Sequence, residues 1–269
     1  RMLKYDSIYG ISQDSIEWDE QHLYVGNHRI RCLSEYDPEN LDWGSHGVDI
    51  VMECTGKFTS ADKAKIHIQN GAKKVIISAP GKDEDATIVL GVNEEIYDPS
   101  KHHIISNASC TTNCIAPLIQ VLHDNFKVVQ GMMTTIHSYT NDQQILDKRH
   151  KDPRRARAAA MNIIPTTTGA AKAVGKVIPE LNGKVHGMAF RVPTASVSVA
   201  DFVATLDSKI DEISVNQAYK SAASGKLSGI LEFSTEPLVS TDYRGNKSSC
   251  IIDGLSTLSL NDNMVKIVG

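Results

Sequence analysis

Long hydrophobic runs are missing from this sequence. No apolar stretch approaches the roughly 20 residues that a transmembrane helix requires, and the first residues, Arg1 to Tyr5, contain no apolar signal core. Long runs of one charge are also missing, and the formal net charge is only −4, which argues against a surface for nucleic acid or another polyanion. We expect a soluble, cytoplasmic protein that acts on small molecules, with neither membrane nor nucleic acid among its partners.

Cysteines are few, and their number is odd. Five cysteines in 269 residues, without a secretion signal, argue against a disulfide framework and favour a reduced compartment. Cys110 and Cys114 form one close pair, but no second pair or suitably spaced His completes the four ligands of a zinc site. We therefore predict no metal site.

The first part of the chain alternates strand and helix patterns, within a length that predicts two domains. Nearly continuous apolar runs at 48–53, 74–78 and 103–106 are typical of strands buried on both faces of a parallel sheet. Between the first two runs, residues 60–71 form a helix pattern that opens on a Ser and ends at a Gly. This βαβ unit predicts an α/β, doubly wound domain.

Beyond about residue 109 the pattern changes. Longer alternating segments, such as 184–191 and 196–206, are separated by helical stretches. Such alternation predicts a mostly antiparallel sheet with one covered face. We therefore expect an α+β second domain, with the boundary placed so that the domains are residues 1–109 and 110–269.

Cys110 is the candidate nucleophile. It lies between the strand at 103–106 and an apolar helical pattern at 115–122. Unpaired amides and the positive end of a helix dipole lower a thiol pKa at such a junction, and the thiolate is the reactive form. Free cysteines are usually small buried residues, and we keep that interpretation for Cys114, one helical turn further on. For Cys110, the neighbouring hydroxyl groups and the junction favour a nucleophile.

His137 is the candidate base. It ends the strand-like run 128–136, which places its ring at the rim of a sheet, where it can reach a thiolate on a neighbouring element. A Cys beside a His is the arrangement of an activated nucleophile. The other histidines, including the pair at 102–103, are interpreted as surface or satisfied core residues.

The stretch 109–114, Ser-Cys-Thr-Thr-Asn-Cys, resembles the active-site motif of glyceraldehyde-3-phosphate dehydrogenases. Seven further motifs occur in that family's order, at residues 4–7, 54–58, 78–80, 137–140, 168–174, 191–194 and 240–243. The resemblance implies a homotetrameric oxidoreductase that converts glyceraldehyde 3-phosphate, inorganic phosphate and NAD+ or NADP+ to 1,3-bisphosphoglycerate and NADH or NADPH. It also implies that the first domain is an incomplete Rossmann-type NAD(P)-binding domain and that the second is the catalytic domain.

The resemblance also implies roles for single residues. Cys110 would form a thiohemiacetal and then a thioester, with His137 as its base. Two anion sites are needed, for which hydroxyls, backbone amides and Arg are suitable donors. The implied residues are Thr140 and Arg191 for the substrate phosphate, and Ser109, Thr111, Thr168 and Gly169 for the incoming phosphate.

The cofactor site is only partly represented. The fingerprint Gly-x-Gly-x-x-Gly, expected on a first βα turn, is absent from the sequence. In the family it precedes the motif at 4–7, so we expect it upstream of Arg1, and a Tyr-x-Asn-Glu segment just past Gly269. The cofactor residues that the resemblance implies within the chain are Thr55, Gly56, Ser78 and Asn141.

Lys148 and Arg149 bear on the choice of cofactor. Many NAD-dependent members of the family have Leu-Pro here, and in the family's tetramer this loop approaches the adenine ribose of a neighbouring subunit. Two cations would favour a 2′-phosphate. The pair therefore predicts tolerance of NADP, or a preference for it. The alternative is a solvated basic turn.

Three other functions stay open. An erythrose-4-phosphate dehydrogenase shares the fold and the Cys/His pair but hydrolyses its thioester. A chain that lacks the Gly-rich loop could be a non-catalytic binding module. A Cys/His amide hydrolase would need an orienting Asn or Asp, and it would explain neither the phosphate donors nor the βαβ unit.

Overall fold

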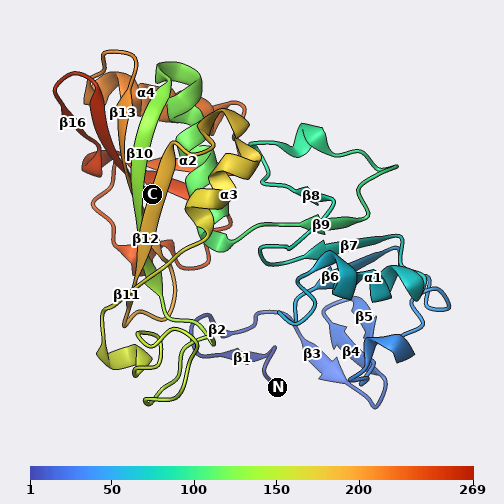
Figure 1. Cartoon of the computed structure of the whole chain (residues 1–269). Coiled ribbons are helices and arrows are strands. Elements are labelled where there is room, and N and C mark those ends of the chain that lie inside the picture. Colours follow the sequence, from blue (N-terminus) through green and yellow to red (C-terminus); the bar gives the residue numbers. More distant parts are fainter.

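The computed structural model describes all residues, Arg1–Gly269, and contains two main sheets (Figure 1). The first is a four-stranded sheet in the order β6-β7-β9-β8, in which all neighbours are parallel. Its strands are β6 (Ile50–Glu53), β7 (Lys74–Ile77), β8 (Ala86–Thr87) and β9 (Ile104–Ser106). Helix α1 (Ala61–Gln69) connects β6 to β7 and packs on the sheet. The predicted βαβ unit is confirmed.

The prediction that these strands are buried on both faces is wrong. Val51 and Ile77 lie in the core, but Ile50 is 54% exposed and Met52 is 67% exposed. The reason is that α1 covers one face of the sheet, where Ala64 is fully buried. Helix α1 begins after Ser60, as predicted, but the Ser60 side chain makes no capping hydrogen bond. Beyond the helix, Gly71 has a φ of +102° and lies directly against the backbone of Gly44, where a Cβ has no room.

The second sheet has six strands in the order β11-β12-β10-β13-β17-β16. Only β10 and β12 are parallel, and the other neighbours are antiparallel, so the prediction of a mostly antiparallel sheet is confirmed. The strands are β10 (Val128–Ser138), β11 (Ile164–Thr166), β12 (Val185–Val192), β13 (Val199–Leu206), β16 (Leu258–Leu260) and β17 (Met264–Val268).

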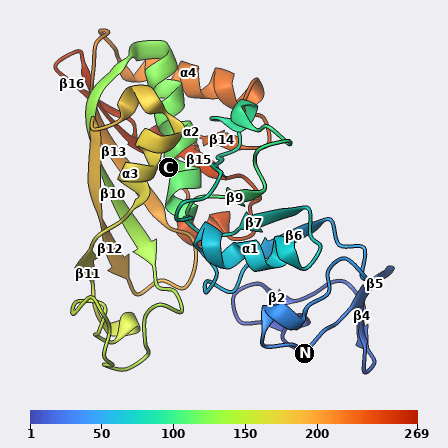
Figure 2. The ribbon, with the colours of Figure 1, turned by 45° about the vertical axis from the view of Figure 1, so that its right-hand side comes forward.

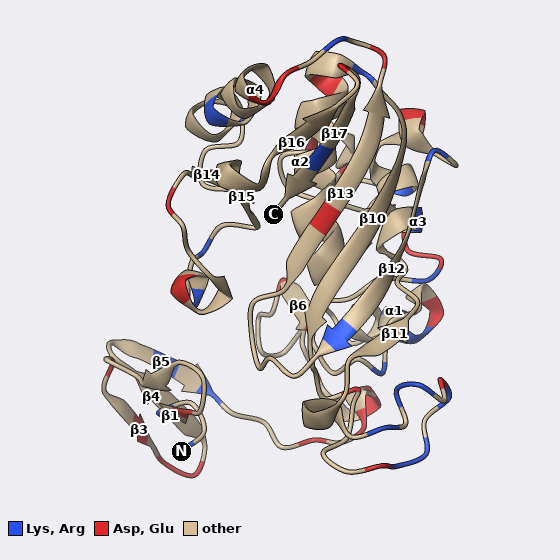
Figure 3. Cartoon of the chain, turned by 90° about the vertical axis from the view of Figure 1, so that its left-hand side faces the viewer, with Lys and Arg blue, Asp and Glu red and all other residues tan.

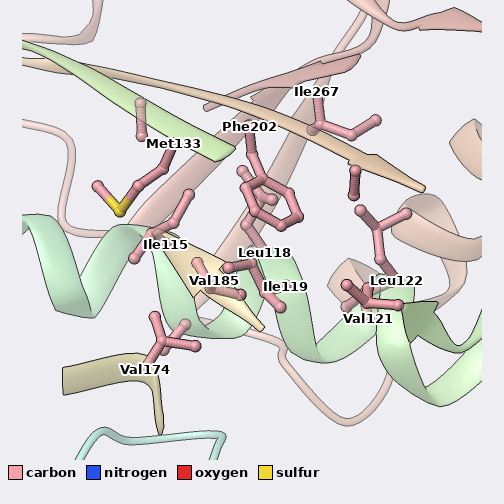
Figure 4. Close-up of a cluster of buried hydrophobic side chains, with 14 of the residues drawn as sticks. Ile115, Leu118, Ile119, Val121, Leu122, Met133, Val174, Val185, Phe202 and Ile267 are labelled. Carbon is pink, nitrogen blue, oxygen red and sulfur yellow. The ribbon is translucent and has the colours of Figure 1, made fainter. Parts of the chain in front are cut away.

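Helices α2 (Cys110–Phe126) and α3 (Ala170–Val177) lie on one face of this sheet, as the views in Figures 1 and 2 agree. Figure 4 shows how the apolar side of α2 meets the sheet: Leu118 and Ile119 lie beside Phe202 of β13, and Ile115 beside Met133 of β10. All five side chains are at most 1% exposed. Removing a side chain of the size of Phe202 typically costs about 3–5 kcal/mol, so this packing fixes where α2 begins.

Smaller elements complete the chain. Helix α4 (Glu212–Ser224) begins with a capping box formed by Asp211 and Ser214 and packs against α2. No helix combines the length and the apolar character needed to cross a membrane. The remaining strands are β1 (Tyr5–Asp6), β2 (Gly10–Ile11), β3 (Ile16–Trp18), β4 (His22–Val25), β5 (His28–Arg31), β14 (Leu231–Ser234) and β15 (Cys250–Asp253). The short 3₁₀ helices are η1 (Pro38–Asn40), η2 (Glu94–Ile96), η3 (Ala159–Met161), η4 (Pro179–Leu181), η5 (Ser240–Tyr243) and η6 (Gly254–Ser256).

Candidate active site

The carboxyl ends of three neighbouring parallel strands carry predicted site residues. Thr55 and Gly56 follow β6, Ser78 follows β7, and Cys110 follows β9 after a short loop. The Ser78 amide donates to the Glu53 carbonyl, and the Asn107 amide donates to the Ile77 carbonyl, so the three strand ends are tied together. In open α/β sheets, ligands bind outside this edge. The fold therefore brings three of the predicted cofactor residues and the predicted nucleophile to one edge.

Cys110 is the first residue of α2 and lies at the strand-to-helix junction that the sequence predicted. Ser109 caps the helix, because its Oγ accepts from the Thr112 amide at 3.1 Å. The Cys110 amide has no acceptor within the chain, which is typical of the first turn of a helix. Cys110 is exposed to solvent. Cys110 also lines a cavity, which is open to a reactant.

His137 lies beside the sulfur. Its Nε2 is 3.4 Å from Cys110 Sγ, and its Nδ1 is 2.6 Å from the Ser138 carbonyl oxygen. A carbonyl can only accept, so Nδ1 carries a proton, and in the neutral ring the Nε2 lone pair faces the thiol. The ring is thus set to take the thiol proton. The resulting imidazolium would hold the thiolate as an ion pair.

The thiol of Cys110 is acidified by its surroundings. The hydrogen bond from His137 is the largest cause, and it holds the pKa of the Cys110 thiol below its ordinary value. Desolvation opposes this effect, while the charge of His137 and hydrogen bonds from Thr111 add to it. A thiol with a lowered pKa is thiolate at lower pH, and the thiolate is the nucleophile. Cys110 therefore has the lowered pKa that is typical of an activated nucleophile.

Ser138 and Ser198 support His137, and sequence reasoning missed both. The Ser138 amide donates to Ser198 Oγ at 3.1 Å, and Ser138 Oγ donates to the Val197 carbonyl at 3.1 Å. Val197 has a φ of +62°, which is unusual for a β-branched residue. These contacts hold the carbonyl that orients the His137 ring. No local signal could reveal them, because they link residues about 60 positions apart.

Thr140 and Arg191 are brought together beside Cys110 and His137. An Nη1 donor of Arg191 is 3.2 Å from Thr140 Oγ1 and 3.1 Å from the Ser138 carbonyl. Arg191 Nε is buried and has no acceptor in the chain. Burial lowers the pKa of Arg191, and the nearby charge of Arg155 lowers it further. A partly desolvated guanidinium with an unused donor suits an anionic ligand.

The hydroxyls predicted for the incoming phosphate are partly engaged. Ser109 Oγ caps α2 and also lies 2.7 Å from Thr112 Oγ1. Thr111 is buried and contributes to the lowered pKa of Cys110. Thr168 Oγ1 accepts from the Ala170 amide at 3.2 Å, and Gly169 is the N-cap of α3. Helix α3 packs against α2, the helix that begins at Cys110.

A cavity of about 620 Å³ opens beside Cys110 and extends to segments far from it in the sequence. Its walls include Tyr9 near the N-terminus and Tyr243 of η5. The cavity also reaches Cys114, whose sulfur is 3.6 Å from that of the buried Cys250. Cys114 is half-buried and packs against the core, which is consistent with a packing role.

The predicted cofactor residues lie in two places. Ser78, Thr55 and Gly56 lie at the edge of the four-stranded sheet. Asn141, Lys148 and Arg149 lie in the long loop between β10 and β11, along which Figure 3 shows several Lys and Arg positions in blue. Neither Lys148 nor Arg149 forms an ion pair, whereas Arg155 and Arg157 of the same loop pair with Asp142 and Asp147 at 2.7 Å each.

Two family models match the chain. The model of the "Glyceraldehyde 3-phosphate dehydrogenase, C-terminal domain" matches residues 109–269. The chain belongs to the glyceraldehyde-3-phosphate dehydrogenase family. The NAD binding domain of the same family matches residues 1–61, so the Rossmann-type character of the first part is confirmed.

Curated relatives match along nearly the whole chain. Glyceraldehyde-3-phosphate dehydrogenase of Geobacillus stearothermophilus is 59% identical over 267 residues, which cover 99% of this chain and 80% of the relative. The protein of the same name from Priestia megaterium is 58% identical with the same coverage. Glyceraldehyde-3-phosphate dehydrogenase 1 of Bacillus subtilis is 57% identical, again with the same coverage. The likeness therefore extends well beyond the catalytic motif.

Proposed function

We propose that this chain carries the catalytic machinery of a phosphorylating glyceraldehyde-3-phosphate dehydrogenase, an NAD(P)-dependent oxidoreductase. The reaction converts glyceraldehyde 3-phosphate and inorganic phosphate to 1,3-bisphosphoglycerate. The observation that carries this proposal is the 3.4 Å approach of His137 Nε2 to Cys110 Sγ, with the ring oriented by the Ser138 carbonyl. Arg191 and Thr140 lie beside this pair and are suited to hold the substrate phosphate.

In the first step, the Cys110 thiolate attacks the aldehyde carbon. A carbon–sulfur bond forms, and negative charge develops on the aldehyde oxygen. The free Cys110 amide and protonated His137 are the donors for that oxygen, and the proton of His137 completes a thiohemiacetal. The Arg191–Thr140 pair fixes the other end of the substrate, because it binds the phosphate group.

In the second step, His137 Nε2 takes back the hydroxyl proton as the carbon is oxidised, which leaves a thioester on Cys110. A bound nicotinamide supplies the hydride acceptor for this oxidation. Inorganic phosphate, held near Thr168 and the N-terminus of α3, then attacks the thioester carbon. The carbon–sulfur bond breaks, and Cys110 leaves as a thiolate that the His137 imidazolium stabilises.

The residues present fit a dinucleotide. Gly56 has a φ of +73°, nothing lies within 4 Å of the position where its Cβ would be, and its amide has no acceptor in the chain. This amide stands at the carboxyl edge of the parallel sheet, close to Thr55 and to Ser78 of the next strand. Free amides at this edge are suitable donors for ribose and pyrophosphate oxygens. We assign Thr55, Gly56 and Ser78 to the cofactor, together with Asn141 of the loop after β10.

The dependence of the rate on phosphate tests the reaction type. In the full-length enzyme, reduction of NAD(P)+ by glyceraldehyde 3-phosphate is expected to rise at least about tenfold from phosphate-free buffer to saturating phosphate, because phosphate is the nucleophile that releases the thioester. The measurement is initial NAD(P)H absorbance at a series of phosphate concentrations. A rate indifferent to phosphate, with erythrose 4-phosphate as the better substrate, would support the hydrolytic alternative.

We also propose that Lys148 and Arg149 admit NADP+, because both cations are exposed and unpaired. Replacing them as Lys148→Leu/Arg149→Pro is expected to raise KM for NADP+ about tenfold and to leave KM for NAD+ within about twofold, since one charge-assisted contact to a 2′-phosphate accounts for such a change. Initial-rate kinetics with both cofactors measure this effect. Lys151→Leu in the same loop is the matched control, and an unchanged NADP+/NAD+ ratio in the double variant would sink the idea.

We further propose a homotetramer in the cytoplasm. Large apolar side chains are exposed on the loop between β10 and β11, where Ile145 is 86% and Leu146 is 73% exposed, and on the open face of the large sheet, where Met132 is 62% exposed. Symmetric subunit contacts would remove this surface from water. All five cysteines are free thiols, which is consistent with a reducing compartment. The proposed domains remain residues 1–109 and 110–269.

A further inference from the structure

A buried polar chain runs from Trp43 to the proposed cofactor loop. The indole Nε1 of Trp43 donates to His67 Nδ1 at 3.1 Å, and His67 Nε2 lies 3.2 Å from Glu53 Oε2. The other oxygen of Glu53 accepts from the Thr55 amide at 2.7 Å and from the Thr55 hydroxyl at 2.5 Å. Glu53 and His67 are each 4% exposed. His67 belongs to α1 and Glu53 ends β6, so the chain connects the helix to the edge of the sheet (Figure 1).

The direction of every bond in this chain is fixed. An indole N–H can only donate, so His67 Nδ1 accepts and the neutral ring carries its proton on Nε2. That proton is donated to Glu53, which must therefore accept on Oε2, while Oε1 accepts twice from Thr55. Each of these buried groups has a hydrogen-bond partner only when all the others keep the same donor and acceptor roles, which makes this series of hydrogen bonds rigid.

The chain determines what the loop can offer to a ligand. The Thr55 hydroxyl donates its hydrogen bond to Glu53, and Thr55 Oγ1 accepts from the Lys57 amide at 3.1 Å. The next amide, that of Gly56, is the donor that stays free. Glu53 therefore sets the position of Thr55, and Thr55 in turn fixes where the Gly56 amide stands at the sheet edge.

We propose that Glu53, held by His67 and Trp43, is a positioning residue for the cofactor: it aligns the Thr55–Gly56 loop so that the Gly56 amide can bind the dinucleotide. The inference rests on the proposed assignment of Thr55 and Gly56 to the cofactor site. None of the hydrogen bonds made by the Glu53 side chain leads to Cys110 or His137. Its effect should consequently appear in cofactor binding and not in the acyl-transfer chemistry.

The variant Glu53→Gln tests this role with almost no change of shape. A Gln amide has one accepting oxygen, and its NH2 group can only donate, so it cannot accept from both His67 and Thr55 on separate oxygens. In the full-length enzyme we expect KM for NAD+ to rise about tenfold, which matches the loss of about one charge-assisted hydrogen bond. We expect kcat at saturating NAD+, and the rate at which iodoacetate alkylates Cys110 without cofactor, to stay within about twofold of the parent values.

Substitutions at His67 provide a graded series. His67→Gln can still accept from Trp43 and donate to Glu53, so its KM for NAD+ should stay close to that of the parent enzyme. His67→Leu leaves Glu53 Oε2 buried and unpaired, so its KM should rise. The series keeps the proposal testable even if Glu53→Gln does not fold. Equal KM values for the Gln and Leu variants at position 67 would overturn it.

Asp85→Asn is the matched control for general damage to the sheet. Asp85 Oδ2 accepts from the His103 and Ile104 amides at 2.7 and 2.8 Å, in the same parallel sheet, but does not touch Thr55. This variant should lose thermal stability and keep its KM for NAD+. A KM that rises as much in Asp85→Asn as in Glu53→Gln would mean that Glu53 acts only through stability, and would overturn the inference.

Thr55→Val separates the inference from the function on which it rests. If Thr55→Val leaves KM for NAD+ unchanged, the loop is not part of the cofactor site, and that part of the proposed function fails. If Thr55→Val raises KM but Glu53→Gln does not, only the positioning role fails. In the double variant, Glu53→Gln should add little to the KM for NAD+ of Thr55→Val, because both substitutions break the same hydrogen bonds. Additive effects on KM would show that Glu53 does not act through Thr55.

Discussion

Replacing Cys110 with Ser is expected to lower kcat/KM for glyceraldehyde 3-phosphate by about four orders of magnitude or more, which corresponds to about 5.5 kcal/mol of transition-state stabilisation. A Ser hydroxyl keeps the shape of the side chain, but His137 at 3.4 Å cannot ionise it to a useful extent near neutral pH. The thioester would become a less reactive ester as well. Initial rates of NAD(P)H formation in the full-length enzyme measure the loss.

Cys114→Ser is the matched control for this substitution. Cys114 lies one turn further along α2 and touches Cys250 at 3.6 Å, so its replacement disturbs the same helix without removing the thiolate. Its kcat/KM should stay within about threefold of the parent value, because exposed or half-buried polar exchanges of this size usually change little. Comparable losses in both variants would mean that the helix, and not the Cys110 sulfur, is the sensitive feature.

The positions of Cys110 and His137, the proposed catalytic pair, were predictable because each residue lies near the end of its own element. A strand followed by a helical pattern placed Cys110 at a strand-to-helix junction, and the end of a long strand-like run placed His137 at a sheet rim. The structure has both junctions where the sequence patterns put them. The distance between the two side chains is a tertiary property, however. It depends on how α2 packs on β10 through Ile115 and Met133.

The groups that orient the site were not predictable in the same way. Ser138 contacts Val197 and Ser198, and Cys114 contacts Cys250 across 136 positions, so no local period or motif signals either contact. The polar chain through Glu53 and His67 was hidden for another reason. A His on an amphipathic helix and a Glu at a strand end both look like ordinary surface residues until the helix is placed on the sheet.

The wrong prediction that the parallel strands are buried on both faces also has a physical explanation. A run such as Ile50-Val51-Met52 reads as a strand buried on both faces, because every residue is apolar. In the structure only Val51 is buried, since α1 packs on its side of the sheet and no element of this chain packs on the side of Ile50 and Met52. A hydrophobic pattern therefore predicts that a face is suited to burial, and the covering element has to be established separately.

His137→Asn is expected to lower kcat by about a thousandfold, the usual range for loss of a positioned acid–base group. The shorter Asn can still donate to the Ser138 carbonyl, but it cannot take a proton from Cys110. Because the hydrogen bond from His137 is the largest cause of the lowered pKa of the Cys110 thiol, the variant also raises that pKa. Less thiolate is then present at neutral pH. The midpoint of Cys110 ionisation moves up toward the ordinary thiol pKa of about 8.5.

Alkylation by iodoacetate separates the raised pKa of Cys110 from the lost proton transfer, because its rate depends on the thiolate and needs no substrate. In the parent protein the rate should already have levelled off at pH values where an ordinary thiol is still protonated, and in His137→Asn the rise should occur at higher pH. His186→Asn, on the exposed side of the neighbouring strand β12, should leave the profile unchanged. If His137→Asn also leaves it unchanged while kcat falls, the N-terminus of α2 alone acidifies Cys110, and His137 acts only in the proton transfers of the thiohemiacetal.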